Sequence, residues 1–157
     1  MKITTLKKLL FYINNLKCLD KKIVLVTGCF DILHQAHRQF LDQAKKIGDV
    51  LMVGLEGDKR TRKLKGPNRP INTWKVRAQN LASQKVVDFI FPLPEDLDQP
   101  QVQSELINQL RPDILAVSSH TLHLDKKRKL MRKYGGQLKI VSLFNPSVST
   151  TKLLSVR

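Results

Sequence analysis

Two histidines, His34 and His37, stand three residues apart just beyond a glycine turn. The turn, Thr27-Gly28-Cys29, follows a short apolar run over 23–26, and helical spacing begins after it. At that spacing both imidazoles share one face of the first helical turn. A strand, a glycine turn and a helix in this order direct backbone N–H groups and the positive end of the helix at one spot, which suits an anion. The pattern therefore predicts a site that holds a triphosphate during phosphoryl chemistry.

The same pair has two other interpretations, one structural and one metal-binding. Units of strand, glycine turn and helix are common, and a histidine pair at this spacing is often structural. Zinc is disfavoured, because no cysteine or glutamate stands at ligand spacing from the two histidines. No metal-ligating residues are therefore predicted.

The elements that must position the histidines follow from hydrophobic periodicity. Short apolar runs, typical of buried parallel strands, alternate with helical patterns. We expect strands over 23–26, 50–54, 86–91, 114–117 and 138–143, and helices over 3–17, 35–47, 74–84, 101–110 and 126–133. This alternation predicts an α/β fold: a single Rossmann-like, doubly wound domain with a five-stranded, mostly parallel sheet. Residues 1–20 are expected to form a helix packing on the core at the sheet edge, and 21–157 the functional domain.

The stretch from Asp58 to Asn72 is the most basic part of the chain. Gly66, Pro67 and Pro70 favour a loop or flap here. Because the stretch follows the second strand, it lies where an open parallel sheet faces its ligand, and mobile lysines there would close over a triphosphate. A solvated surface is the plainer alternative.

Composition limits the partners and the compartment. Twenty-eight Lys and Arg against 13 Asp and Glu give a formal net charge of +15, so the partners are anionic. Only 6% of residues are aromatic, which leaves few stacking platforms and argues against specific nucleic-acid binding. Two cysteines in no metal or redox spacing fit a reduced, cytoplasmic compartment. The apolar run over 9–13 is too short for a membrane span or a signal sequence.

Two segments together carry a family resemblance. Gly28, Phe30, Asp31, His34 and His37 resemble the GxFDxxHxGH signature of the cytidylyltransferase-like nucleotidyltransferases, with Ala36 where that family has glycine. The segment LKGPNRPIN, residues 64–72, resembles the LKGxxRPxN segment of the sugar 1-phosphate adenylyltransferases, in particular the heptose 1-phosphate branch. The resemblance spans roughly residues 20–155.

This resemblance implies roles for individual residues. His34, His37, Lys65 and Arg77 would act on the reacting phosphates, although a surface salt bridge is an equal alternative for Arg77. Nucleotide-binding positions would be Thr27, Gly28, Cys29, Phe30, Ala36, Asp58 and Lys63. Ser149, Thr150 and Thr151, ordinary helix caps when taken alone, resemble the family's STT motif. After the fourth strand the relatives usually carry a glycine–aspartate pair that this chain lacks, and we expect Ser118 to His123 to cap the next helix rather than bind a base.

The activity that the resemblance implies is transfer of AMP from ATP to a sugar 1-phosphate, with release of pyrophosphate. Mg²⁺ would arrive with the nucleotide, since the chain shows no dedicated carboxylate cage. Cytidylyl transfer to glycerol phosphate or an amino-alcohol phosphate is the near alternative, and a catalytically degenerate nucleotide- or nucleic-acid-binding module the far one. The sequence leaves open whether the protein is a monomer or a homodimer.

Overall fold

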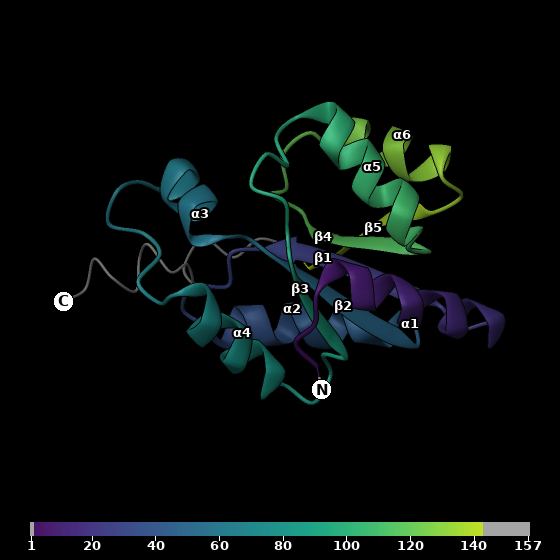
Figure 1. The fold of residues 1–157 in the computed structure, drawn as a ribbon, viewed down its shortest axis with the longest axis horizontal. Coiled ribbons are helices and arrows are strands. Elements are labelled where there is room, and N and C mark those ends of the chain that lie inside the picture. Colours follow the sequence, from purple (N-terminus) through teal and green to yellow (C-terminus); the bar gives the residue numbers. More distant parts are fainter. Residues whose placement is uncertain (1, 143–157) are drawn as a thin grey trace.

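The computed structural model describes residues 2–142, and its centre is one parallel sheet (Figure 1). The five strands lie in the order β3-β2-β1-β4-β5, and all pairs are parallel. The bounds are β1 Ile23–Gly28, β2 Val50–Leu55, β3 Phe89–Pro92, β4 Ile114–Ser118 and β5 Gln137–Ser142. The chain runs outward from β1 to β3 and then crosses to β4, so the strand order reverses between β1 and β4. This confirms the predicted doubly wound domain.

The described residues also form six helices: α1 Leu6–Cys18, α2 Gln35–Lys46, α3 Asp58–Lys65, α4 Trp74–Ala82, α5 Pro100–Leu110 and α6 Leu124–Lys133. Helices α1, α5 and α6 contribute to the hydrophobic layer on one face, and α2 and α4 to the layer on the other. Helix α3 stands beyond the sheet (Figure 1).

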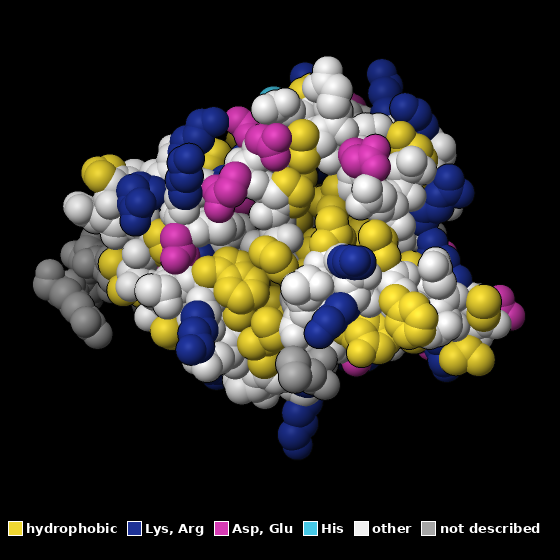
Figure 2. Space-filling view, in the orientation of Figure 1, with side chains coloured by type: hydrophobic (Ala, Val, Ile, Leu, Met, Phe, Trp, Pro, Cys, Tyr) yellow, Lys and Arg dark blue, Asp and Glu magenta, His cyan; other side chains and the backbone are white. Residues whose placement is uncertain are grey.

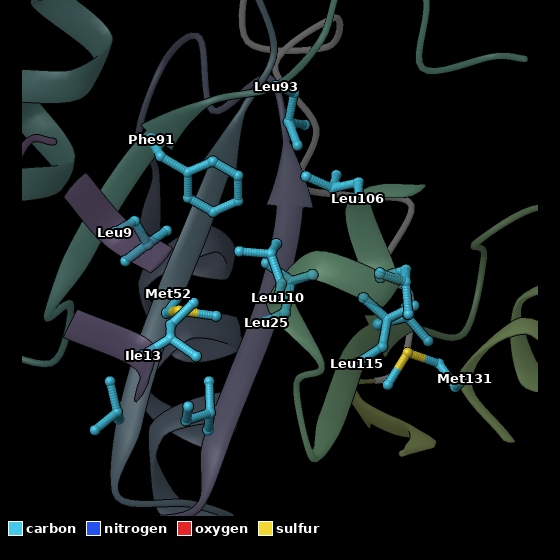
Figure 3. Packing of buried hydrophobic residues seen from close by; sticks show 14 residues of the cluster. Leu9, Ile13, Leu25, Met52, Phe91, Leu93, Leu106, Leu110, Leu115 and Met131 are labelled. Carbon is cyan, nitrogen blue, oxygen red and sulfur yellow. The ribbon is translucent and has the colours of Figure 1, made fainter. Parts of the chain in front are cut away.

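Alternating strand residues fill these two layers. Leu25 and Met52 enter the layer with α1 and α5, whereas Val24 and Leu51 enter the opposite layer. Figure 3 shows the first layer, where side chains of α1 and α5 lie around those of the central strands. Because both faces are covered, the strands read as continuous apolar runs instead of alternating ones.

One predicted loop is wrong: residues 58–65 form helix α3. Gly66, Pro67 and Pro70 all lie after this stretch, and the stretch itself is rich in Lys and Arg, which favour helix. Asp58 in the first turn and Lys65 in the last carry charges opposite to the partial charges at these helix ends, which stabilises α3. The glycine and prolines act on residues 66–72 alone.

Thr27 and Gly28, expected in a turn, are instead the last two residues of β1. They pair with Gly54 and Leu55, so the ladder with β2 continues through them.

The first helix and the third strand both begin later than predicted. The first helix begins at Leu6, because residues 2–4 extend alongside β3 and Ile3 pairs with Ile90. Strand β3 begins at Phe89, because residues 83–86 form a turn that the Val87 N–H closes on the Gln84 carbonyl. The Asp88 carboxylate accepts hydrogen bonds from the Leu51 N–H and the Lys45 ammonium, so this acid joins β2 to α2.

The surface holds an apolar region near α1 (Figure 2). Phe11 and Tyr12 are exposed on α1, and a cleft of about 420 Å³ between α1 and α5 is lined by Leu6, Val102 and Leu106, among others. None of the histidine-motif residues lines this cleft. Within the described part of the chain, every helix is too short or too polar to cross a bilayer.

Candidate active site

The turn after β1 lies at the carboxyl end of the central strand, beside the point where strand order reverses. Open parallel sheets bind their ligands at that edge. Thr27 is exposed there, whereas Cys29 and Phe30 are buried. Phe30 has a φ of +45°, which is uncommon for a residue with a side chain. Its ring folds over Gly28, where an added Cβ would lie 3.0 Å from it, so glycine leaves room for the ring.

The two histidines meet at the start of α2. His34 is the N-cap of that helix, and His37 lies in its first turn. Their rings stack with centroids 3.8 Å apart, and the Phe30 ring meets His37 edge-on at 5.3 Å. The predicted common face is therefore present, and Ala36 lies between the two rings in sequence, partly buried.

Burial keeps His37 uncharged at neutral pH. Loss of solvation, together with the charges of His34 and Lys65, lowers the pKa of His37 to about 4, while a backbone hydrogen bond to Ile32 acts in the opposite direction. Burial also lowers the pKa of His34. Neutral rings accept at one nitrogen and donate at the other, so a bound anion would favour a second proton on this pair.

The aspartate of the motif is structural. Asp31 is 1% exposed, and its carboxylate pairs with the Arg69 guanidinium at 2.8 Å. It also accepts from the backbone N–H of Ile71 at 2.8 Å and of Asn72 at 2.9 Å. The Asn72 side chain in turn donates to the Asp31 carbonyl. The two segments that carry the family resemblance are thus bound to each other.

The two predicted lysines both lie in the last turn of α3 but have different surroundings. Lys65 at its end lies close enough for its charge to act on His37. Lys63 is exposed and pairs with Asp98 at 2.9 Å. Of these two lysines, Lys65 is the one whose charge acts on His37.

Arg77 lies beneath the turn instead of within reach of solvent. It is fully buried on α4, and it donates to the carbonyl oxygens of Cys29 at 2.6 Å, Glu56 at 2.8 Å and Asn72 at 3.1 Å. It also pairs with Asp58 at 2.7 Å. The burial of Arg77 argues against the predicted phosphate contact. The salt bridge offered as the alternative is present, although Arg77 is buried and not on the surface. Asp58, which was predicted to bind the nucleotide, is thus the carboxylate that pairs with Arg77.

A further charged group lies at the end of β2, and sequence reasoning missed it. Glu56 is largely buried and pairs with Arg60 at 2.7 Å. Burial raises the pKa of Glu56, whereas burial lowers that of Lys127 on α6, an effect that the Glu56 charge opposes. The sequence could have indicated Glu56 by its position. It directly follows a buried strand, and the ends of parallel strands line the edge where ligands bind.

Of the residues after β4, one stands at the N-cap of α6 as predicted, but its side chain makes no capping hydrogen bond. His123 is the N-cap, in a left-handed conformation with φ +57° and no side-chain cap bond. The Ser118 hydroxyl instead bonds the His120 ring at 3.0 Å. These polar groups therefore bond one another just beyond the carboxyl end of β4. Ser149, Thr150 and Thr151 lie outside the described residues.

Curated relatives are similar to this chain over most of its length. Bifunctional protein HldE of Pseudomonas fluorescens is 34% identical over 157 residues, covering 99% of this chain and 32% of the relative. Bifunctional protein HldE of Sulfurimonas denitrificans is 40% identical over 134 residues, covering 85% of this chain and 26% of the relative. The chain thus spans about a quarter to a third of the length of these relatives.

A solved structure agrees with the fold. The lipopolysaccharide core biosynthesis protein from Thermoplasma volcanium superposes with a TM-score of 0.63 at 25% identity, covering 80% of this chain and 97% of that one. A family model described as cytidylyltransferase-like matches residues 25–153, from β1 through β5 and beyond. That match includes the glycine turn, the stacked histidines and the segment bound to Asp31, and the chain belongs to the cytidylyltransferase-like family of nucleotidyltransferases.

Proposed function

We propose that this chain transfers AMP from ATP to a sugar 1-phosphate of the heptose 1-phosphate type. A phosphate oxygen of the acceptor attacks the α-phosphorus of ATP, the bond between the α-phosphorus and its bridging oxygen to the β-phosphate breaks, and pyrophosphate leaves. The observation that carries the proposal is the pair of stacked rings, His34 and His37, at the N-terminus of α2. The charge of Lys65 acts on His37 as well. Such a transfer needs alignment and charge neutralisation more than covalent chemistry.

The proposed roles follow the geometry of the site. His34 and His37 donate hydrogen bonds to charge that develops at the α- and β-phosphates, and Lys65 neutralises further oxygens. The backbone of residues 27–30 surrounds the phosphates, and the first turn of α2 at Ala36 lies against the nucleotide. Lys63 joins the phosphates when it leaves Asp98, and the hydroxyl residues 149–151 remain proposed nucleotide ligands.

Mg²⁺ would accompany the nucleotide. Among residues 2–142, no three His, Cys, Asp or Glu side chains gather at ligand spacing. This donor set fits an ion held mainly by nucleotide oxygens, since Mg²⁺ usually combines few carboxylates with substrate phosphates and water. When bound, it neutralises phosphate charge.

The adenylyl donor and the sugar acceptor are supported by two observations. The LKGxxRPxN-like segment resembles that of sugar 1-phosphate adenylyltransferases. Three of its residues, Arg69, Ile71 and Asn72, donate hydrogen bonds to Asp31 of the histidine motif. The similar Thermoplasma volcanium protein is named for lipopolysaccharide core biosynthesis.

The test is pyrophosphate release from ATP or CTP with Mg²⁺, each offered heptose 1-phosphate, hexose 1-phosphates or glycerol phosphate. We expect ATP with a sugar 1-phosphate to give the highest rate and a nucleoside-diphosphate sugar by mass spectrometry. His34→Ala should lower turnover by about 10²–10³ while the protein stays folded. Preference for CTP with an alcohol phosphate would favour the cytidylyl alternative, and absence of nucleotide binding would favour a degenerate module.

A further inference from the structure

We infer that Arg77 is a positioning residue. It orients the phosphate-binding turn by holding the Cys29 carbonyl of that turn inward, together with the carbonyls of two neighbouring segments. This inference rests on the proposed transfer at the same site and assigns Arg77 a role that contact with phosphate would exclude. Arg77 is fully buried, and its Nε, Nη1 and Nη2 atoms all donate to protein oxygens. A phosphate would have to displace those partners to reach the guanidinium.

The three carbonyls come from three segments that meet at the ligand edge. Cys29 belongs to the turn after β1, Glu56 follows β2, and Asn72 ends the segment bound to Asp31. The planar guanidinium carries five N–H donors in a fixed fork, so one side chain can hold all three oxygens. Lysine, with one nitrogen on a flexible stem, cannot occupy the three positions together.

Holding these carbonyls fixes the direction of the neighbouring N–H groups. In a planar trans peptide the C=O and the following N–H point in opposite directions. The Cys29 carbonyl faces Arg77, so the Phe30 N–H faces away from it, and the Glu56 carbonyl turns the Gly57 N–H likewise. Within the described range, neither N–H donates a hydrogen bond to the protein. Two backbone donors are therefore left at the carboxyl edge, where a phosphate oxygen can accept from them.

The strained conformation of Phe30 agrees with this role. Its φ of +45° is held from both sides, since Arg77 binds the carbonyl of Cys29 and the Asp31 carboxylate binds Ile71 and Asn72. Such conformations persist where the surroundings over-determine them. Asp58 supports the arrangement from outside, because its carboxylate pairs with the Nη2 of Arg77.

The experiment compares ATP binding by the wild type, Arg77→Lys and Leu81→Ala. Leu81 is fully buried on the same helix, one turn beyond Arg77, so its truncation destabilises the fold without touching the three carbonyls. We expect Arg77→Lys to weaken ATP binding about tenfold, the effect of one lost charge-assisted hydrogen bond. We expect Leu81→Ala to bind ATP as the wild type does at a temperature where all three proteins are folded.

The amide signal of Phe30 provides a readout that stability alone does not move. In ¹⁵N-labelled wild-type protein, ATP should shift the Phe30 proton downfield, and in Arg77→Lys this shift should be lost even at saturating ATP. If Arg77→Lys does not fold, Asp58→Asn loosens one partner of the guanidinium and should reduce both ATP affinity and the Phe30 shift.

The outcomes separate this inference from the proposed function. A folded Arg77→Lys protein that binds ATP as tightly as the wild type and keeps the Phe30 shift overturns the positioning role alone. If Arg77→Lys does not fold, an Asp58→Asn protein that keeps the wild-type ATP affinity and the Phe30 amide shift has the same consequence. Equal weakening in Leu81→Ala also overturns it, since lost stability would then explain the effect. A wild-type protein that binds neither ATP nor pyrophosphate overturns both proposals.

Discussion

Replacing His37 with asparagine should remove part of the pH dependence of folding stability. Burial and the charges of His34 and Lys65 lower the pKa of His37 to about 4 from its ordinary value of 6.5. Between these values the unfolded chain binds more protons than the folded chain. The stability is therefore fully present above pH 6.5 and is lost as the pH falls toward 4. From pH 7 to pH 5 the loss attributable to His37 is about 2 kcal/mol.

Urea unfolding at pH 7, 6 and 5 measures this difference. The wild type should lose about 2 kcal/mol more than His37→Asn over that range. His123→Asn is the matched control, because it makes the same chemical change at an exposed residue whose φ of +57° asparagine accepts. The control should keep the wild-type loss. An equal loss in the wild type and His37→Asn would refute the reasoning, as would an NMR titration of the His37 ring with a midpoint near 6.5.

Two further substitutions test the anchoring of the motif and its departure from the family. Asp31→Asn should cost about 3–5 kcal/mol in urea unfolding, because it leaves the buried Arg69 without its carboxylate, and a loss below about 1 kcal/mol would contradict that role. Ala36→Gly should bind ATP more tightly in calorimetry, since removing the methyl group lets the nucleotide approach the first turn of α2, despite a helix penalty of ~1 kcal/mol. Binding that is unchanged or weaker would show that Ala36 does not limit the site.

Local patterns determined the fold class and the place of the histidines. A strand, a turn and a helix are set by residues close together in the chain, and helical spacing alone puts His34 and His37 on one face. The apolar runs over 23–26, 50–54 and 114–117 needed only their own composition to become β1, β2 and β4. The error at residues 58–65 came from extending the effect of Gly66 and Pro67 backward into a stretch that favours helix.

The sequence did not predict the burial of Arg77, which was expected to contact phosphate or to form a surface salt bridge. Arg77 and Leu81 stand four residues apart in α4 and share a face, and both are fully buried. Helical spacing gives that shared face, but it does not show that an arginine on it turns inward. It does not show which oxygens will receive its hydrogen bonds.

The tertiary structure alone decided which charged groups meet. Asp31 and Arg69 are 38 residues apart, and Arg77 and Cys29 are 48 residues apart. Opposite charges along a sequence do not reveal such pairs, because the chain offers many lysines and arginines to few acids. Parallel strands bring their carboxyl ends to one edge, and the turns that follow them must bury or satisfy their polar groups there. No local stretch of sequence contains that requirement. It explains why the buried Asp31 pairs with Arg69 and why the buried Arg77 donates to the Cys29 carbonyl.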